Sequence, residues 1–279
     1  MEGLSQDVVS YKAKYLDSSF VICGFYGDVS SSFSINEPQG YFYVKMDQSS
    51  KILVNKRTEF NSFMDPIKEN VEVTKFLKED RKKDKDVLHR KSDLIMRDIL
   101  LKANGDLVIL SEILNWSETL EMTSGGTMTT NYNFEYGDIL AVSFDSEGKS
   151  KWMQRIFKLQ QTVDDYGFYS SYSVAEQENE LHFIMNDRLF YVDYETYENQ
   201  SDTERSAAKE VIVLGGATIS NNGKLVRYTV LNSEQYSSDK LAPRSALFAQ
   251  NELVFFGRKR LNVTRVPAGV SSLELNQKE

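Results

Sequence analysis

The strongest constraint on the fold is a hairpin pattern that the chain repeats three times. In each copy an apolar run is followed by Asp or Ser, then by three residues, then by Lys and a second strand. The copies turn at Asp47, Asp145 and Ser220. Asp and Ser side chains accept hydrogen bonds from nearby backbone amides, and Gly adopts positive φ without steric cost, so the middle of each copy is a tight turn. A lone hairpin is marginally stable, and the repetition therefore predicts larger sheets.

A second repeated element lies ahead of the hairpins and occurs four times. It is a polar turn followed by an apolar strand, at residues 19–24, 107–111, 181–185 and 253–257, and each strand follows another short strand. Recurring four-stranded antiparallel units are typical of a β-propeller. We therefore predict an all-β, propeller-like array in one domain, 1–279, with units at about 8–60, 96–157, 167–231 and 244–279. Whether the ring closes or belongs to a larger propeller is left open.

The hairpin of residues 137–157 carries a more specific pattern. Asp145, Gly148, Lys149 and Trp152 form D-x-x-G-K-x-x-W. This resembles the blade repeat of quinoprotein-type (PQQ-like) propellers, and the chain also resembles uncharacterised bacterial propeller proteins with irregular blades. The resemblance implies that the Gly and Trp help neighbouring blades to dock, so Trp152 is expected to be buried between units. The other two hairpins lack the Trp, and no quinone or other cofactor is carried over.

The connections of the array fall into two classes. Some turns are uniformly tight, whereas the long connections at 28–39, 115–136, 187–209 and 232–243 and a charged insertion at 61–95 lie on the opposite face of a propeller. We predict one or two helices in the insertion, a loop over 115–136 that contains a flexible stretch at Thr123–Thr130, and an extra strand at 190–194. Long loops on a rigid scaffold are common sites of binding, which makes this elaborated face the candidate working face.

Strand ends on the elaborated face would surround the mouth of the central channel. Carboxylates, guanidiniums and an aromatic side chain around a concave mouth suit a polar ligand such as a sugar or a peptide. The alternative is that these are ordinary polar strand ends. The candidate ligand-binding residues are Arg97, Glu112, Tyr172, Asn186, Asp187, Arg244 and Arg258.

Several function classes lack their usual signals. The formal net charge of −8 argues against a general nucleic-acid binder, which needs basic surfaces. Cys23 is the single cysteine, and the two histidines, His89 and His182, belong to no Cys/His metal cluster, so we predict no metal site. His182 and Cys23 are expected in the core. No nucleophile elbow, P-loop or dinucleotide motif occurs.

Two hypotheses about function remain. The first is a non-enzymatic binding module with an unknown protein or glycan partner, which the missing catalytic motifs favour. The alternative is a glycan-acting hydrolase or lyase that uses carboxylates on the same face. No apolar run has the length of a membrane span, and no signal peptide opens the chain. A secreted or periplasmic location, with an export signal removed from this chain, is left open.

Overall fold

A computed structural model describes most of the chain, and all structural statements concern the described residues. These are 6–16, 19–28, 38–59, 87–102, 104–122, 125–192, 211–231, 241–249, 252–257 and 263–267. The chain divides into two compact units. The first comprises residues 1–167 with 219–225, and the second comprises 168–218 with 226–279.

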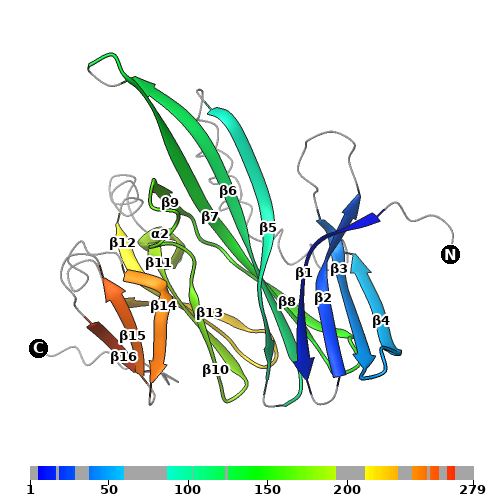
Figure 1. The fold of residues 1–279 in the computed structure, drawn as a ribbon. Helices are drawn as coiled ribbons and strands as arrows, with labels where there is room; N and C mark the ends of the chain where they lie inside the picture. Colours follow the sequence, from blue (N-terminus) through cyan, green and yellow to red (C-terminus); the bar gives the residue numbers. More distant parts are fainter. Residues whose placement is uncertain are drawn as a thin grey trace, which may run out of the picture. The chain divides into compact units, whose positions relative to one another are not determined.

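Two antiparallel sheets belong to the first unit (Figure 1). Neighbours in each sheet follow one another along the chain. One sheet holds β1 (Gln6–Leu16), β2 (Ser19–Asp28), β3 (Pro38–Asp47) and β4 (Ile52–Glu59). The other holds β5 (Val87–Leu101), β6 (Leu107–Met122), β7 (Met128–Phe144) and β8 (Ser150–Ile156), with the short β9 (Gln160–Val163) beside β7.

The remaining two sheets have the same sequential order. The third holds β10 (Ser173–Gln177), β11 (Glu180–Arg188), β12 (Ile212–Ile219) and β13 (Leu225–Leu231). The fourth holds β14 (Leu241–Ala249), β15 (Glu252–Gly257) and β16 (Val263–Pro267). The four strands 19–24, 107–111, 181–185 and 253–257 lie in β2, β6, β11 and β15, each the second strand of its sheet. The prediction of an all-β array of antiparallel sheets is confirmed; the assignment of 1–279 to one domain stays a prediction.

The three repeated hairpins share one turn geometry. The amides of Asp47, Asp145 and Ser220 each donate to the carbonyl four residues ahead at 3.0 Å. Asp145 Oδ1 also accepts the amides of Glu147 at 3.0 Å and Lys149 at 2.9 Å. The fourth turn position has positive φ in every copy, with values of 64° at Ser50, 74° at Gly148 and 87° at Gly223. This is the left-handed region that favours Gly, as the sequence pattern predicts.

Two of these turns lie directly against aromatic rings of the first unit. A Cβ added at Gly148 would lie 2.4 Å from the Tyr43 ring, and one at Gly223 would lie 2.6 Å from the Trp152 ring. Trp152 is only 8% exposed and donates Nε1–H to the Asn221 carbonyl at 3.0 Å. The expected burial of Trp152 is therefore confirmed, and the glycines allow close approach of turn and ring.

The core of the first unit lies between its two sheets. Cys23, Phe25, Tyr43, Ile109 and Phe144 are buried members of one apolar cluster. The Tyr41 and Phe144 rings meet edge to face with centroids 5.0 Å apart, a favoured arrangement of aromatic pairs. At the edge of the second sheet, Lys14 of β1 donates Nζ–H to the Ile99 carbonyl of β5 at 2.9 Å. A lysine thus uses a β5 carbonyl that has no ladder partner on that side.

Three sequence expectations about irregular segments need correction. β5 begins at Val87, so the last part of the predicted helical insertion 61–95 is strand; residues 60–86 lie outside the described part. The predicted loop 115–136 is a long hairpin, because β6 continues to Met122 and β7 begins at Met128. Where an extra strand was expected at 190–194, the structure has the short helix α2 (Leu189–Val192). Val192 is buried there, and a helical turn takes the place of the expected strand.

The second unit has its own apolar core. Leu181, Phe183, Leu214 and Ala217 are fully buried, and the Tyr172 ring packs on Phe183 with centroids 5.6 Å apart. Among the described residues, no helix has the length and apolar character needed to cross a membrane.

Candidate functional site

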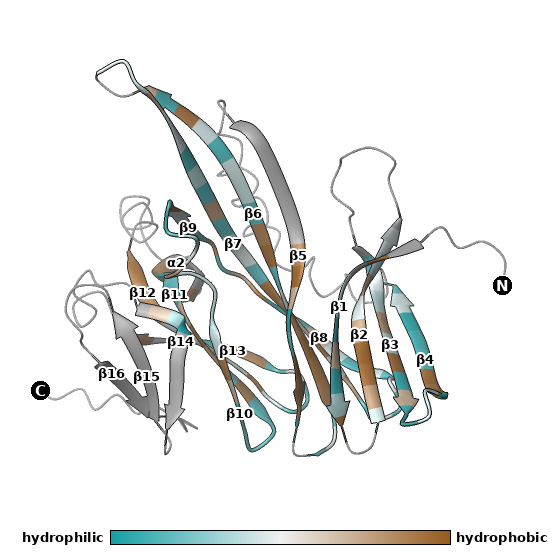
Figure 2. Ribbon diagram, viewed as in Figure 1, coloured by the Kyte–Doolittle hydropathy of each residue, from teal (hydrophilic) through white to brown (hydrophobic). Residues whose placement is uncertain are grey.

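The long β6–β7 hairpin, residues 115–136, is called the arm here, and its two faces differ in chemistry. Residues directly opposite on β6 and β7 point to the same side of the sheet, and neighbours along a strand alternate. One side therefore carries the polar face: Asn115, Ser117, Thr119 and Glu121 opposite Glu135, Asn133, Asn131 and Thr129. The other side carries the mainly apolar face: Trp116, Leu120, Met122, Met128, Tyr132 and Phe134, with Glu118 and Thr130 among them. Figure 2 shows hydropathy alternating along this part of β6 and β7.

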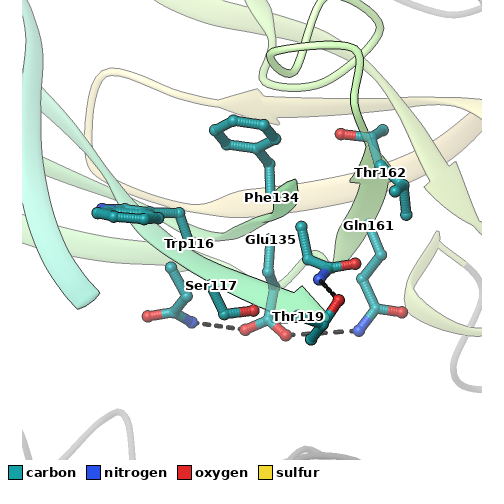
Figure 3. Close-up of a pocket in the computed structure, with 10 residues that line it drawn as sticks. Trp116, Ser117, Thr119, Phe134, Glu135, Gln161 and Thr162 are labelled. Carbon is teal, nitrogen blue, oxygen red and sulfur yellow. Dashed lines mark hydrogen bonds between the residues drawn. The ribbon is translucent and has the colours of Figure 1, made fainter. Parts of the chain in front are cut away.

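A hollow of about 310 Å³ lies where the arm meets β9 (Figure 3). Six of its lining residues have hydrogen-bonding side chains and lie on the polar face or on the continuation of that face on β9. These are Asn115, Ser117, Thr119, Asn133, Glu135 and Gln161. Trp116, Phe134, Thr162 and Val163 complete the lining. In Figure 3, Phe134 points away from Glu135, as the strand alternation requires.

Hydrogen bonds hold the polar side chains of the hollow in place. Asn115 Nδ2 donates to Glu135 Oε1 at 2.6 Å, and Gln161 Nε2 donates to Glu135 Oε2 at 3.4 Å. One carboxylate on the middle strand is thus bridged by amides from both neighbouring strands. Beside this row, Asn133 Nδ2 donates to Thr119 Oγ1 at 3.0 Å. Fixed donors and acceptors reduce the ordering cost of binding a polar ligand.

Short-range contacts position β9 against β7. The Asp164 amide donates to the Tyr132 carbonyl at 2.9 Å, and the Tyr132 amide donates to Asp164 Oδ1 at 2.8 Å. The side chain of Asp164 thereby extends the ladder beyond the end of β9. Gly167 follows in a left-handed conformation, with φ of 69°, where a Cβ would lie 2.2 Å from the Tyr136 hydroxyl. The chain can therefore close over Tyr136 only with a glycine at this position.

Adjacent to the hollow is a layer of buried charges centred on Glu112. This side chain is fully buried, as is Lys158, and Lys158 Nζ lies 2.7 Å from Glu112 Oε1. Arg97 Nε donates to Glu112 Oε2 at 2.7 Å. Lys158 also donates to the Tyr136 carbonyl at 3.1 Å and to Gln160 Oε1 at 3.0 Å. Gln160 begins β9, so the buried lysine joins β6, β7 and the start of β9.

A second buried carboxylate of this charged layer is Asp138. It forms an ion pair with Arg155 of β8, whose Nε donates to Oδ2 at 2.7 Å. Its Oδ1 accepts the Lys158 amide at 3.2 Å. Both carboxylates of the layer therefore have cationic partners, which makes their burial tolerable.

The residues predicted at the channel mouth fall into two groups. Arg97 and Glu112 meet in the first unit, in the charged layer. Tyr172, Asn186 and Asp187 belong to the second unit and are buried. Asn186 Nδ2 donates to the Tyr169 carbonyl at 2.7 Å, and Asp187 Oδ2 accepts from Arg227 at 2.7 Å. These pairs tie strands and loops together.

The last two candidates are Arg244 and Arg258. Arg244 is exposed on β14, and Arg258 lies outside the described residues. Residues at a channel mouth are expected to be partly exposed, and this expectation is wrong for Glu112, Tyr172 and Asn186, which are at most 8% exposed. Buried partners satisfy the polar groups that strand ends present. A ligand-binding role for the seven residues stays a prediction.

The remaining titratable residues have structural surroundings. Burial raises the pKa of the Cys23 thiol to about 12, which keeps it protonated, and only the thiolate is a strong nucleophile. His182 Nδ1 lies 3.1 Å from Thr218 Oγ1, and burial lowers the pKa of its imidazole, in agreement with a core role. His89 lies on β5, and nothing is described of its side chain. Among the described residues, no group of three His, Cys, Asp or Glu side chains suits a metal ion.

Sequence reasoning missed the residues that line the hollow. Its lining comes from the segment read as a flexible loop because of Thr123–Thr130, together with β9. The available signal was alternation: every odd position from Asn115 to Glu121 is polar, and so is every odd position from Thr129 to Glu135. Period-two polarity over two such runs indicates a hairpin.

Comparisons with known proteins give no family for the chain. No family model matches it, and no curated protein matches it. Among solved structures, a Bacillus subtilis levansucrase with bound oligosaccharides has 12% identity over 90% of this chain and a TM-score of 0.28. A putative glycoside hydrolase from Parabacteroides distasonis has 12% identity over 90% of this chain and 83% of its own, with a TM-score of 0.23. The chain spans 63% of the levansucrase length. Likenesses with TM-scores this low carry no argument about function.

Proposed function

We propose that this protein is a non-enzymatic glycan-binding module and that the hollow of the arm is its binding site. The observation that carries the proposal is the row in which Asn115 and Gln161 hold the Glu135 carboxylate from both sides. Amide groups, hydroxyls and a carboxylate together supply donors and acceptors in one place. A polyhydroxylated ligand needs both kinds at once, because each hydroxyl donates and accepts.

Size and lining support the same class of ligand. A volume of about 310 Å³ lies at the lower end of the range for small-molecule sites, whose lining is usually mostly apolar. Here most lining side chains are polar, which favours a ligand with little apolar surface. A peptide commonly binds by adding a strand to a sheet edge. The hollow instead presents side chains on a sheet face, which favours the sugar.

A glycan-cleaving activity is the competing hypothesis. Glycoside hydrolysis usually needs two carboxyl groups on either side of the bond that breaks. Glu135 is the one carboxylate among the described lining residues, and the nearby Glu112 is held by Lys158 and Arg97. This arrangement supports binding without cleavage.

We also infer that the scaffold is propeller-like with a quinoprotein-type docking contact. The contact of Trp152 with Gly223 and the Asn221 carbonyl supports this. It concerns the scaffold, and no cofactor is implied.

The proposal is tested by screening the purified protein on a glycan array and measuring affinity for the bound class by calorimetry. Glu135→Ala should weaken binding by about 10- to 100-fold, since hydrogen bonds to charged groups contribute about 1.5–3 kcal/mol. Leu120→Ala, on the apolar face of the same hairpin, is the matched control and should bind as the wild type does. No saturable binding to any glycan, or equal binding by the Glu135 variant, would refute the site. Release of a cleaved product would refute the non-enzymatic assignment.

A further inference from the structure

The polar face continues beyond the hollow toward the end of the arm with Asn131, Glu121 and Thr129, which are not among the lining residues. Past the row of Asn115 and Glu135 come the opposed pairs Ser117 with Asn133, Thr119 with Asn131, and Glu121 with Thr129. All eight of these side chains form hydrogen bonds in their ordinary chemistry. Successive rows on one face are two residues apart, about 6.8 Å, so the four rows extend over about 20 Å.

The far rows are ordered by contacts like those of the hollow. Asn131 Nδ2 donates to Glu121 Oε2 at 2.7 Å, and Thr129 Oγ1 donates to the Glu121 carbonyl at 3.2 Å. An Asn on one strand thus holds a Glu on the other, as Asn115 holds Glu135. The same arrangement occurs at both ends of the polar face, and Thr119 with Asn133 fills the space between.

The two faces of the arm differ in what they can bind. Apolar and aromatic side chains occupy most of the side opposite the polar face, whereas the polar face has none between Asn115 and Glu121 or between Thr129 and Glu135. On β6 and β7 the strip is polar along its length, and Val163 of β9 lies at its edge beside Asn133. Such a strip suits a ligand that repeats its own hydroxyl groups along a line. A branched or compact ligand would contact the hollow alone.

We propose that the glycan is a linear oligosaccharide that lies along the whole polar face, from the hollow to Glu121. This inference rests on the proposed function and specifies its ligand as an extended chain of several sugar units. Each further unit placed on the strip gains hydrogen bonds to preordered side chains, so affinity rises with chain length until the strip is covered.

The experiment compares a disaccharide with a hexasaccharide of the glycan class bound on the array. The wild-type protein should bind the hexasaccharide at least tenfold more tightly. Asn131→Ala should weaken hexasaccharide binding by about 2- to 12-fold, the range of one net hydrogen bond between neutral groups, and Glu121→Ala by about 10- to 100-fold, the range for a charged group. Both variants should leave disaccharide binding unchanged. Thr130→Ala and Leu120→Ala alter neighbouring positions on the opposite side and should change neither.

The outcomes separate this inference from the proposed function. Equal affinity for the disaccharide and the hexasaccharide, with loss of both on Glu135→Ala, would leave the hollow as the binding site and overturn the linear ligand. Weakening of both ligands alike by Asn131→Ala would overturn it as well, since the far rows would then act through the hollow. If neither ligand binds, the proposed function fails and the linear ligand fails with it. Unfolding curves of each variant show that the comparison is between folded proteins.

Discussion

β6 and β7 each contain two halves that differ in burial and in the pattern of polar residues. In the first half of β6 and the second half of β7, residues 107–111 and 139–144, nearly every side chain is buried on both faces of the sheet. Beyond Glu112 and Asp138 the same strands form the arm, where exposure increases toward the tip and polarity alternates. Complete burial makes the core half structural, whereas the arm can vary its side chains and still pair. Side chains that bind a ligand can therefore be placed on the arm with less loss of folding stability than in the core half.

The charged layer marks the boundary between the halves. Glu112 and Asp138 are the first carboxylates met on leaving the core half, and both are buried with cationic partners. A register shift between β6 and β7 falls at the same place, between Glu112 and Leu114. Such an irregularity redirects side chains and increases local twist. The boundary thus combines a change of register with a change from apolar to ionic packing.

The largest effect is expected from breaking this boundary. Lys158→Met leaves Glu112 with Arg97 but removes a fully buried cation, and breaking a buried ion pair costs about 3–5 kcal/mol. Lys102→Met is the comparison variant, because Lys102 is also buried and its Nζ contacts include the neutral Asn221 Oδ1 at 3.0 Å and the Trp152 ring. Its loss should cost about 1–3 kcal/mol. Urea unfolding measures both, and a Lys102 variant less stable than the Lys158 variant would contradict the ionic boundary.

An intermediate effect is expected from shortening equivalent side chains in the two halves. Ile109 is completely buried in the core half, so Ile109→Ala should cost about 2–5 kcal/mol through lost contacts and a cavity. Leu120 is 43% exposed on the arm, and Leu120→Ala should stay within about 0.5 kcal/mol of the wild type. Thermal unfolding with two spectroscopic probes checks the pair. Similar losses would mean that the arm belongs to the cooperative core and that the division into halves is wrong.

The same division explains what sequence could predict. The core half of β7, around Val142 and Phe144, is a short apolar run before the turn at Asp145–Gly148, and those local signals sufficed for strands, turns and the repeated order of the sheets. The arm was missed because Gly125, Gly126 and several Thr residues outweighed a period-two pattern that was present. Composition marks only the tip as a turn, while Thr and Tyr favour strands on either side.

The charged layer shows a different limit. Glu112 and Arg97 were singled out as strand-end residues, and they do lie together. Their surroundings could not be foreseen, because Lys158 reaches Glu112 from beyond β8 and no local pattern links the two positions. Pairing between distant strands depends on register and on bulges, which a single sequence does not specify. Glu112, Tyr172 and Asn186 were therefore predicted as partly exposed, whereas they are buried.

The smallest effect on stability is expected from shortening the arm. Glu121–Thr129 would be removed and Leu120 joined to Thr130 by Asn-Gly; these two residues are register partners, and Asn-Gly is the favoured two-residue hairpin turn. Because the removed residues that the structure describes are exposed, the free energy of unfolding should change by about 0.5 kcal/mol or less. The core half and the charged layer remain whole, so circular dichroism should stay strand-rich. A loss of several kcal/mol would show that the tip supports the core.

If the protein stays folded, the hollow still contains Asn115, Thr119 and Glu135, so disaccharide binding should persist while the advantage of the hexasaccharide decreases. Retention of the full hexasaccharide advantage would show that the last row, Glu121 with Thr129, contributes nothing to the ligand.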